Sequence, residues 1–171
     1  MRAIPLTVTA LAAALVLTAC NSGGDSGDKG KSSSACKIGG VSVQVGSASL
    51  APAAGDTGEI PVSITNQSAP CTLEHFPGAT LEGGATTAAL SAQQGAKAQK
   101  LKLVKGDSAS FTISYVRGAA GGKNSLAAKT LKITLPGGTD SQSFPWKYGP
   151  VAGKTKPGDQ AFVSAFQQVG D

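Results

Sequence analysis

The chain contains the stretch Asn66-Gln-Ser-Ala-Pro-Cys-Thr-Leu-Glu-His-Phe-Pro-Gly78, which follows a strongly alternating segment. In that segment, residues 60–65, apolar residues alternate with Ser and Thr, and this period of two predicts a half-buried strand. Residues 66–70 supply turn chemistry, because Asn tolerates left-handed backbone angles and Pro fixes its own φ. The stretch therefore predicts a strand, a tight connection, a short strand over residues 71–73, and a break at Pro77-Gly78, where Gly permits positive φ.

Short alternating segments recur along the rest of the chain and are separated by Gly and Pro. They predict strands at residues 41–45, 79–82, 86–92, 101–103, 111–115, 131–135, 144–148 and 161–168. A helix is the alternative for the Ala-rich residues 86–92 and for residues 161–168. Many short strands with such punctuation predict an all-β fold, an immunoglobulin-like β-sandwich of Greek-key antiparallel sheets.

Residues 1–19 have the pattern of a targeting segment. Arg2 gives a positive start, residues 4–17 are apolar, and Leu17-Thr-Ala-Cys20 ends the segment. A span this short with small residues before its end predicts a signal peptide rather than a membrane helix. Cys20 at the cleavage position predicts a bacterial lipobox, whose thiol accepts diacylglycerol; an ordinary secretory signal is the alternative. We therefore expect a lipid-anchored, exported protein at the outer face of the cytoplasmic membrane.

Residues 21–35 are Ser, Gly, Asp and Lys with almost no apolar side chain. Such a composition does not offset the entropy of ordering, so we expect residues 20–35 to be a lipidated Cys followed by a flexible linker. The linker's root-mean-square reach is about 20 Å for a Gly/Ser coil. Residues 36–171 are the length of one domain.

The motif in residues 66–78, together with Cys36, resembles that of domain-of-unknown-function family 4232, a family of secreted actinobacterial lipoproteins. Members resemble this chain in the order of their parts: a lipobox signal peptide, a polar linker, one Cys at the domain start, then a Cys-Thr-Leu motif. The resemblance covers about residues 36–168 and implies a β-sandwich with no known activity. The family often has a small residue, frequently Gly, where this chain has His75. The matching motif residues are Asn66, Pro70, Cys71, Thr72, Leu73, Phe76, Pro77 and Gly78.

Two cysteines, Cys36 and Cys71, remain once Cys20 is assigned to the lipid. An even pair in an exported domain favours a disulfide. By the loop-closure entropy of a loop of this length, the disulfide would stabilise the folded state by roughly 4 kcal/mol. Free thiols and a metal-binding pair are the alternatives. Two Cys and one distant His lack the close spacing of a zinc site, so we expect no metal and no cofactor.

The charge of the chain is +5, and loss of Arg2 with the signal peptide leaves +4 by subtraction. Part of this charge gathers around one predicted strand. It is either a basic ribbon facing an anionic envelope polymer or lipid head groups, or a solvated face that protects a sheet edge from aggregation. The compartment lies outside the cell and aromatic residues are not interleaved with the lysines, so we expect no nucleic-acid partner. The lysines are Lys97, Lys100, Lys102 and Lys105.

His75 is the only His, so a Ser-His-Asp triad would need it. It lies in a predicted turn, and the chain contains no nucleophile elbow. Glu74 and Glu82 are the alternative carboxylate pair for a hydrolase, but their spacing does not favour that role. We therefore expect no catalysis.

Trp146 shares one predicted face with Phe144 and Tyr148 around Pro145, which suggests an edge strand. These rings are either a stacking platform for sugars or core residues plus an edge aromatic. The sequence as a whole predicts a lipid-anchored extracytoplasmic binding or accessory module whose partner is an anionic envelope polymer or an envelope protein. The alternatives are an envelope-acting hydrolase and a purely structural surface spacer.

Overall fold

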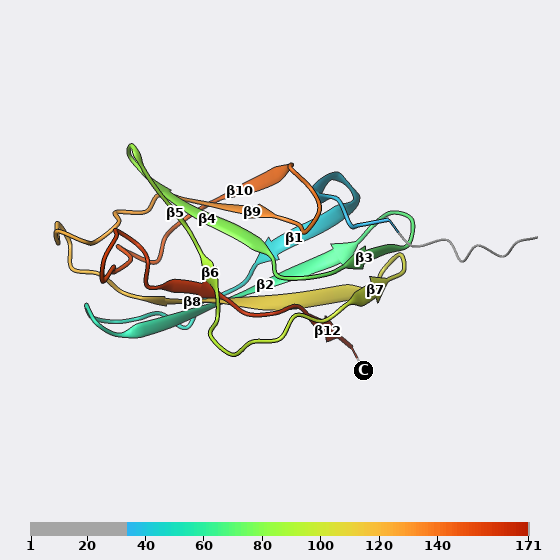
Figure 1. Ribbon diagram of the computed structural model, residues 1–171, viewed down its shortest axis with the longest axis horizontal. Coiled ribbons are helices and arrows are strands. Elements are labelled where there is room, and N and C mark those ends of the chain that lie inside the picture. Colours follow the sequence, from blue (N-terminus) through green and yellow to red (C-terminus); the bar gives the residue numbers. More distant parts are fainter. Residues whose placement is uncertain (1–33, 171) are drawn as a thin grey trace, which may run out of the picture. The chain divides into compact units, whose positions relative to one another are not determined.

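The computed structural model describes residues 34–170, which form an almost entirely β structure (Figure 1). The predicted signal peptide, Cys20 and most of the predicted linker lie outside the described residues. No helix within residues 34–170 is long and apolar enough to cross a membrane. The elements are η1 (Ile38–Gly40), β1 (Val41–Val45), β2 (Thr57–Asn66), β3 (Cys71–Leu73), β4 (Gly78–Gly83), β5 (Thr86–Ala89), β6 (Ser91–Ala92), β7 (Leu101–Leu103), β8 (Ser108–Val116), β9 (Thr130–Thr134), β10 (Ser141–Pro145), β11 (Ala161–Val163) and β12 (Gln167–Val169).

The strands form two layers and a small two-stranded ribbon (Figure 1). One sheet has the order β1-β2-β8-β11-β6, with β12 also paired to β8; the other has the order β10-β9-β4-β5; β3 pairs with β7. The all-β sandwich is thus confirmed, whereas the immunoglobulin-like order stays a prediction. The predicted antiparallel pairing is found at all pairs of named strands but one, since β11 and β6 run parallel. The chain changes sheets at Leu90, between β5 and β6, and this crossover sets the direction of β6.

The alternation that predicted the strands is also the pattern of burial. Inward residues of β2 and β8 meet across the register, with Ile60 opposite Ile113 and Val62 opposite Phe111. The buried side chains of both sheets form one apolar core. Burial of a large aliphatic or aromatic side chain contributes about 1.5–3 kcal/mol, so these alternating residues supply most of the driving force for folding.

The last segment is a strand, as predicted, but it is broken by a bulge. Val163 faces Ile113 while Gln167 faces Ser110, so four steps along the last segment correspond to three along β8. The extra residue turns Phe166 into the core, where its ring packs edge-to-face on Phe111 with centroids 5.6 Å apart. The helix alternatives for residues 86–92 and 161–168 are wrong, because both segments pair in sheets.

The described chain begins at what we term the proximal end of the sandwich (Figure 1). The amide of Thr72 donates to the carbonyl of Ser34 at 3.0 Å, and the amide of Cys36 donates to the carbonyl of Thr72 at 2.9 Å. Backbone pairing therefore already includes Ser34 and Ala35, which the sequence placed in the linker. The proximal end also carries the β2–β3 connection (67–70), the β7–β8 turn (104–107) and the β9–β10 turn (136–140). The opposite, distal end carries the loops at 46–56, 117–129 and 146–160.

Candidate functional site at the proximal end

Asn66 of the motif is buried, with 1% of its surface exposed. Its side-chain amide donates to the carbonyl oxygens of Leu103 at 3.0 Å and Ala69 at 3.1 Å, and its Oδ1 accepts from the amide of Ser68 at 3.0 Å. Buried polar groups need such partners, because an unsatisfied one costs about 1–3 kcal/mol. Asn66 thus ties the β2–β3 connection to β7. The sequence predicted Asn66 only as a turn residue that tolerates left-handed backbone angles. It missed the contact with Leu103, because Leu103 is distant in the chain.

Cys36 and Cys71 form a disulfide, which confirms that prediction over free thiols or a metal pair. The Cα atoms are 4.9 Å apart and both residues are buried. The bond joins the start of the described chain to the first residue of β3. The domain is therefore cross-linked at the point where residues 1–33 connect to it.

The turn after β3 contains the only described non-glycine residue with positive φ, His75 at 67°. Its side chain is exposed. The predicted break at Pro77-Gly78 is wrong in its position, because Gly78 begins β4 and the left-handed residue lies three positions earlier. A small residue is needed at Gly78 for a different reason: an added Cβ would lie 2.0 Å from Oγ1 of Thr134. A left-handed backbone angle disfavours a Cβ, which explains why Gly suits the position of His75.

Glu74 is paired with Lys100 across the β3–β7 register. The hydrogen bond and the charge of Lys100 hold the pKa of Glu74 below its usual value. Glu82, the other carboxylate of the predicted pair, is engaged by Lys132 at 2.7 Å on β9. The structure therefore does not bring Glu74 and Glu82 together, and each has its own lysine.

The four predicted lysines surround β7 and all are exposed. Lys102 lies on the outer face of β7, opposite Thr72, while Leu101 and Leu103 point into the core. Lys97 is in the connection before β7, and Lys105 is in the turn after it. Within residues 34–170, Lys100–Glu74 and Lys132–Glu82 are the ion pairs, so Lys97, Lys102 and Lys105 keep free ammonium groups.

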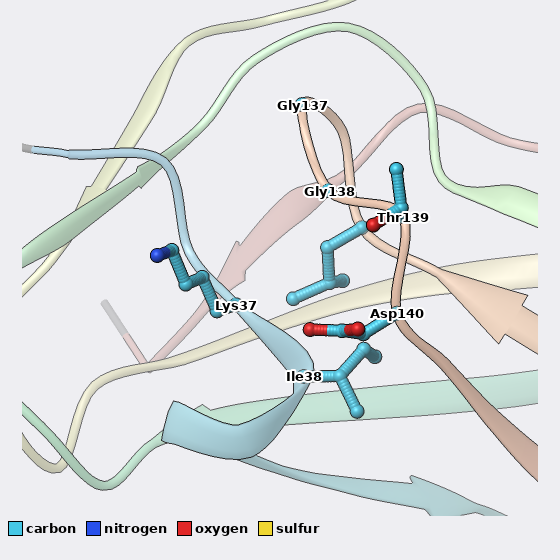
Figure 2. Close-up of a pocket in the computed structure, with 7 residues that line it drawn as sticks. Lys37, Ile38, Gly137, Gly138, Thr139 and Asp140 are labelled. Carbon is cyan, nitrogen blue, oxygen red and sulfur yellow. The ribbon is translucent and has the colours of Figure 1, made fainter.

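Three shallow depressions surround the first described residues. One, of about 230 Å³, has Ile38 and the buried Leu135 among its lining residues. Figure 2 shows the Asp140 carboxylate directed toward the segment that carries Ile38, whereas the ammonium of Lys37 is directed away from Asp140. Lys37 lines two of these depressions and was not among the predicted site residues. No group of three His, Cys, Asp or Glu in the described part of the chain has a metal-binding arrangement.

The aromatic residues after β10 belong to the core and its edge, so the alternative of an open sugar-stacking platform is wrong for Trp146. Trp146 is 6% exposed, packs edge-to-face on Tyr115 at 5.2 Å, and donates its indole N–H to the carbonyl of Gly149 at 2.6 Å. Phe144 and Tyr148 remain half-buried beside a groove of about 460 Å³ between β1 and β10. Burial, followed by the neighbouring Tyr115, raises the pKa of Tyr148. Pro145 ends an edge strand, as predicted.

The fold and the proximal end define a disulfide-linked all-β sandwich whose first described residues pair directly with β3, the Cys71-Thr-Leu strand. Residues 36–167 match the family model described as Domain of unknown function (DUF4232), and the chain belongs to this family. No curated protein and no solved structure matches the chain.

Proposed function

We propose that this protein is a lipid-anchored, extracytoplasmic accessory module that binds a partner and does not catalyse a reaction. The observation that carries the proposal is the position of the Cys36–Cys71 disulfide at the start of the described chain. Disulfides persist in oxidising compartments outside the cytoplasm, which fits a chain whose first residues have the pattern of a lipobox signal peptide. A cross-linked domain start also suits a domain held through that point.

Two features favour binding over catalysis. The single described His, His75, is exposed in the turn after β3, open to solvent and outside any buried site. Glu74 has a lowered pKa, whereas a general acid in glycoside hydrolysis needs a raised one. These observations oppose the hydrolase alternative.

The anchoring part is tested by fractionating cells that express the full chain or its Cys20→Ala variant, with a labelled fatty acid in the medium. We expect the wild type to be labelled and bound to membranes, and the variant to be unlabelled and released. Membrane association of the Cys20→Ala protein would contradict the anchor. Recovery in the cytoplasm with both Cys36 and Cys71 reduced would contradict export.

The non-catalytic part is tested by incubating the purified protein with isolated cell envelope and measuring soluble products over time. We expect no turnover. Product release that disappears in His75→Ala or Glu74→Gln, with unchanged unfolding temperature, would support the hydrolase alternative instead.

A further inference from the structure

The exposed lysines of the proximal end lie beside the start of the described chain. Ala35 bridges Thr72 in parallel, and Thr72 is opposite Lys102. Neighbouring strands are about 4.8 Å apart, so the backbone of Lys102 lies roughly 10 Å from that of Ala35. Lys37 follows Ala35 by two residues, and Lys105 lies in the adjacent β7–β8 turn. Residues far apart in sequence therefore form one basic surface around the chain's first described residues.

Two exposed apolar side chains lie at the same end. Val104 is 47% exposed; it lies two residues after the exposed Lys102, with the buried Leu103 between them. Val169 is 50% exposed and pairs with Ser108, directly after the β7–β8 turn. Leu50, the third large exposed apolar residue described, lies in the 46–56 loop between β1 and β2. The proximal end thus combines cations with apolar side chains, which suits the boundary between lipid head groups and acyl chains.

The carboxylates that the structure describes at this end leave the described surface positive. Glu74 is neutralised by Lys100, and Asp107 accepts the amide of Val104 at 3.0 Å. Asp140 is directed toward the segment of Ile38 (Figure 2). Counted over residues 34–170, the surface has a net charge of +2 when its five lysines are set against these three carboxylates. The five are Lys37, Lys97, Lys100, Lys102 and Lys105.

We propose that this surface docks the domain on anionic lipid head groups, with the proximal end facing the bilayer. The inference rests on the proposed lipid anchor. Residues 21–33 separate Cys20 from Ser34, and a Gly/Ser coil of that length reaches about 20 Å. The anchor therefore holds the basic surface at high effective concentration near the bilayer, so weak attraction by each lysine is sufficient. The domain lies on the membrane instead of sampling all orientations.

The test uses full-length mature protein, with acylation verified by mass, in vesicles that contain phosphatidylglycerol or in neutral vesicles. An amine-reactive reagent modifies exposed lysines, and mass spectrometry reads each one. In anionic vesicles we expect roughly tenfold slower modification of Lys37, Lys97, Lys102 and Lys105 than in neutral vesicles, with no change at the distal Lys123, Lys154 and Lys156. The protection should disappear at 1 M salt, where the Debye length is about 3 Å.

Charge variants supply the matched control. Lys37→Glu/Lys102→Glu/Lys105→Glu should restore fast modification at Lys97, whereas Lys123→Glu/Lys154→Glu/Lys156→Glu, with the same change in net charge, should not. Equal modification at both ends of the acylated protein would overturn the docking and leave the anchor intact. Absence of acylation would instead contradict the proposed function. Protection of the proximal lysines by purified anionic wall polymer but not by anionic vesicles would also overturn the membrane assignment.

Discussion

The two ends of the sandwich are stabilised by different interactions. At the proximal end, the Cys36–Cys71 disulfide and the four hydrogen bonds of the Asn66 side chain, one of them from the Ser68 hydroxyl at 3.2 Å, join the first described residues, the β2–β3 connection and β7. At the distal end the sheets are joined by aromatic packing, with Trp146 edge-to-face on Tyr115 at 5.2 Å. The proximal end is therefore held by a covalent bond and by long-range polar contacts, and the distal end by apolar packing.

The distal loops add hydrogen bonds of their own, both local and between distant segments. The Asp159 carboxylate accepts from the amides of Lys154 at 2.6 Å and Lys156 at 3.0 Å, and from the amide and hydroxyl of Thr155 at 3.0 and 2.7 Å. These bonds, the Thr155 hydroxyl foremost, lower the pKa of Asp159. Arg117 donates to the carbonyl of Ala51 at 2.7 Å and so fixes a second loop. Both ends thus have polar contacts between distant segments, and the disulfide is what distinguishes the proximal end among the described residues.

The largest effect should come from removing the proximal cross-link. Cys36→Ala/Cys71→Ala should lower the free energy of unfolding by about 4 kcal/mol, because the bond closes a loop with a sequence separation of 35 and restricts the unfolded chain. Urea denaturation of the variant and of the oxidised wild type measures the difference. Reduced wild type is the control and should match the variant. A loss below about 1 kcal/mol would mean that the disulfide does not distinguish the stability of the proximal end from that of the distal end.

At the distal end, Gly58→Ala should cost about 2 kcal/mol through overpacking. An added Cβ would lie 2.4 Å from a ring carbon of Tyr115, and an aromatic ring has little freedom to shift. Gly39→Ala is the matched control, since nothing lies within 4 Å of its added Cβ. Thermal unfolding should separate the two variants. Equal midpoints would mean that the ring packing is looser than the structure indicates.

A smaller effect, about 1 kcal/mol at neutral pH, is expected for Asp159→Asn, which removes the charge from its hydrogen bonds. Because folding depresses the pKa of Asp159, its contribution is present above the ordinary carboxyl range near pH 4 and is lost as the pH falls below it. Unfolding measured from pH 7 to pH 3 should therefore show the variant and wild type converging. A constant gap between Asp159→Asn and wild type over this pH range would contradict this assignment.

The smallest effect should be a gain. His75→Gly should stabilise the protein by about 0.5 kcal/mol, because relief of the left-handed strain, roughly 1–2 kcal/mol, slightly exceeds the extra entropy that Gly brings to the unfolded chain. His75→Ala keeps the Cβ and should give no gain. Denaturation midpoints of the three proteins test this, and equal stabilisation by Ala would assign the effect to the imidazole instead of the backbone.

Much of the fold was predictable because strand burial is a local pattern. Alternating residues such as Ile60 to Thr65 and Phe111 to Tyr115 became paired strands of one sheet. The disulfide also followed from the count of cysteines. The candidate site was only half predictable: the lysines around β7 were identified, but Lys37 and Val104 were not, because each is a single residue without a local pattern. Their relevance comes from contacts between segments distant in the chain.

The sequence by itself determined the strands, the cysteine pair and the family motif, since each depends on residue type and spacing along the chain. Only the tertiary structure decided that Asn66 is a buried link to Leu103, that the left-handed turn residue is His75, and that Trp146 is covered. It also brought Lys102 beside the start of the described chain. These results depend on strand register and sheet packing. Both are set by pairing between segments far apart in the chain, and the local sequence of one segment does not specify its partner.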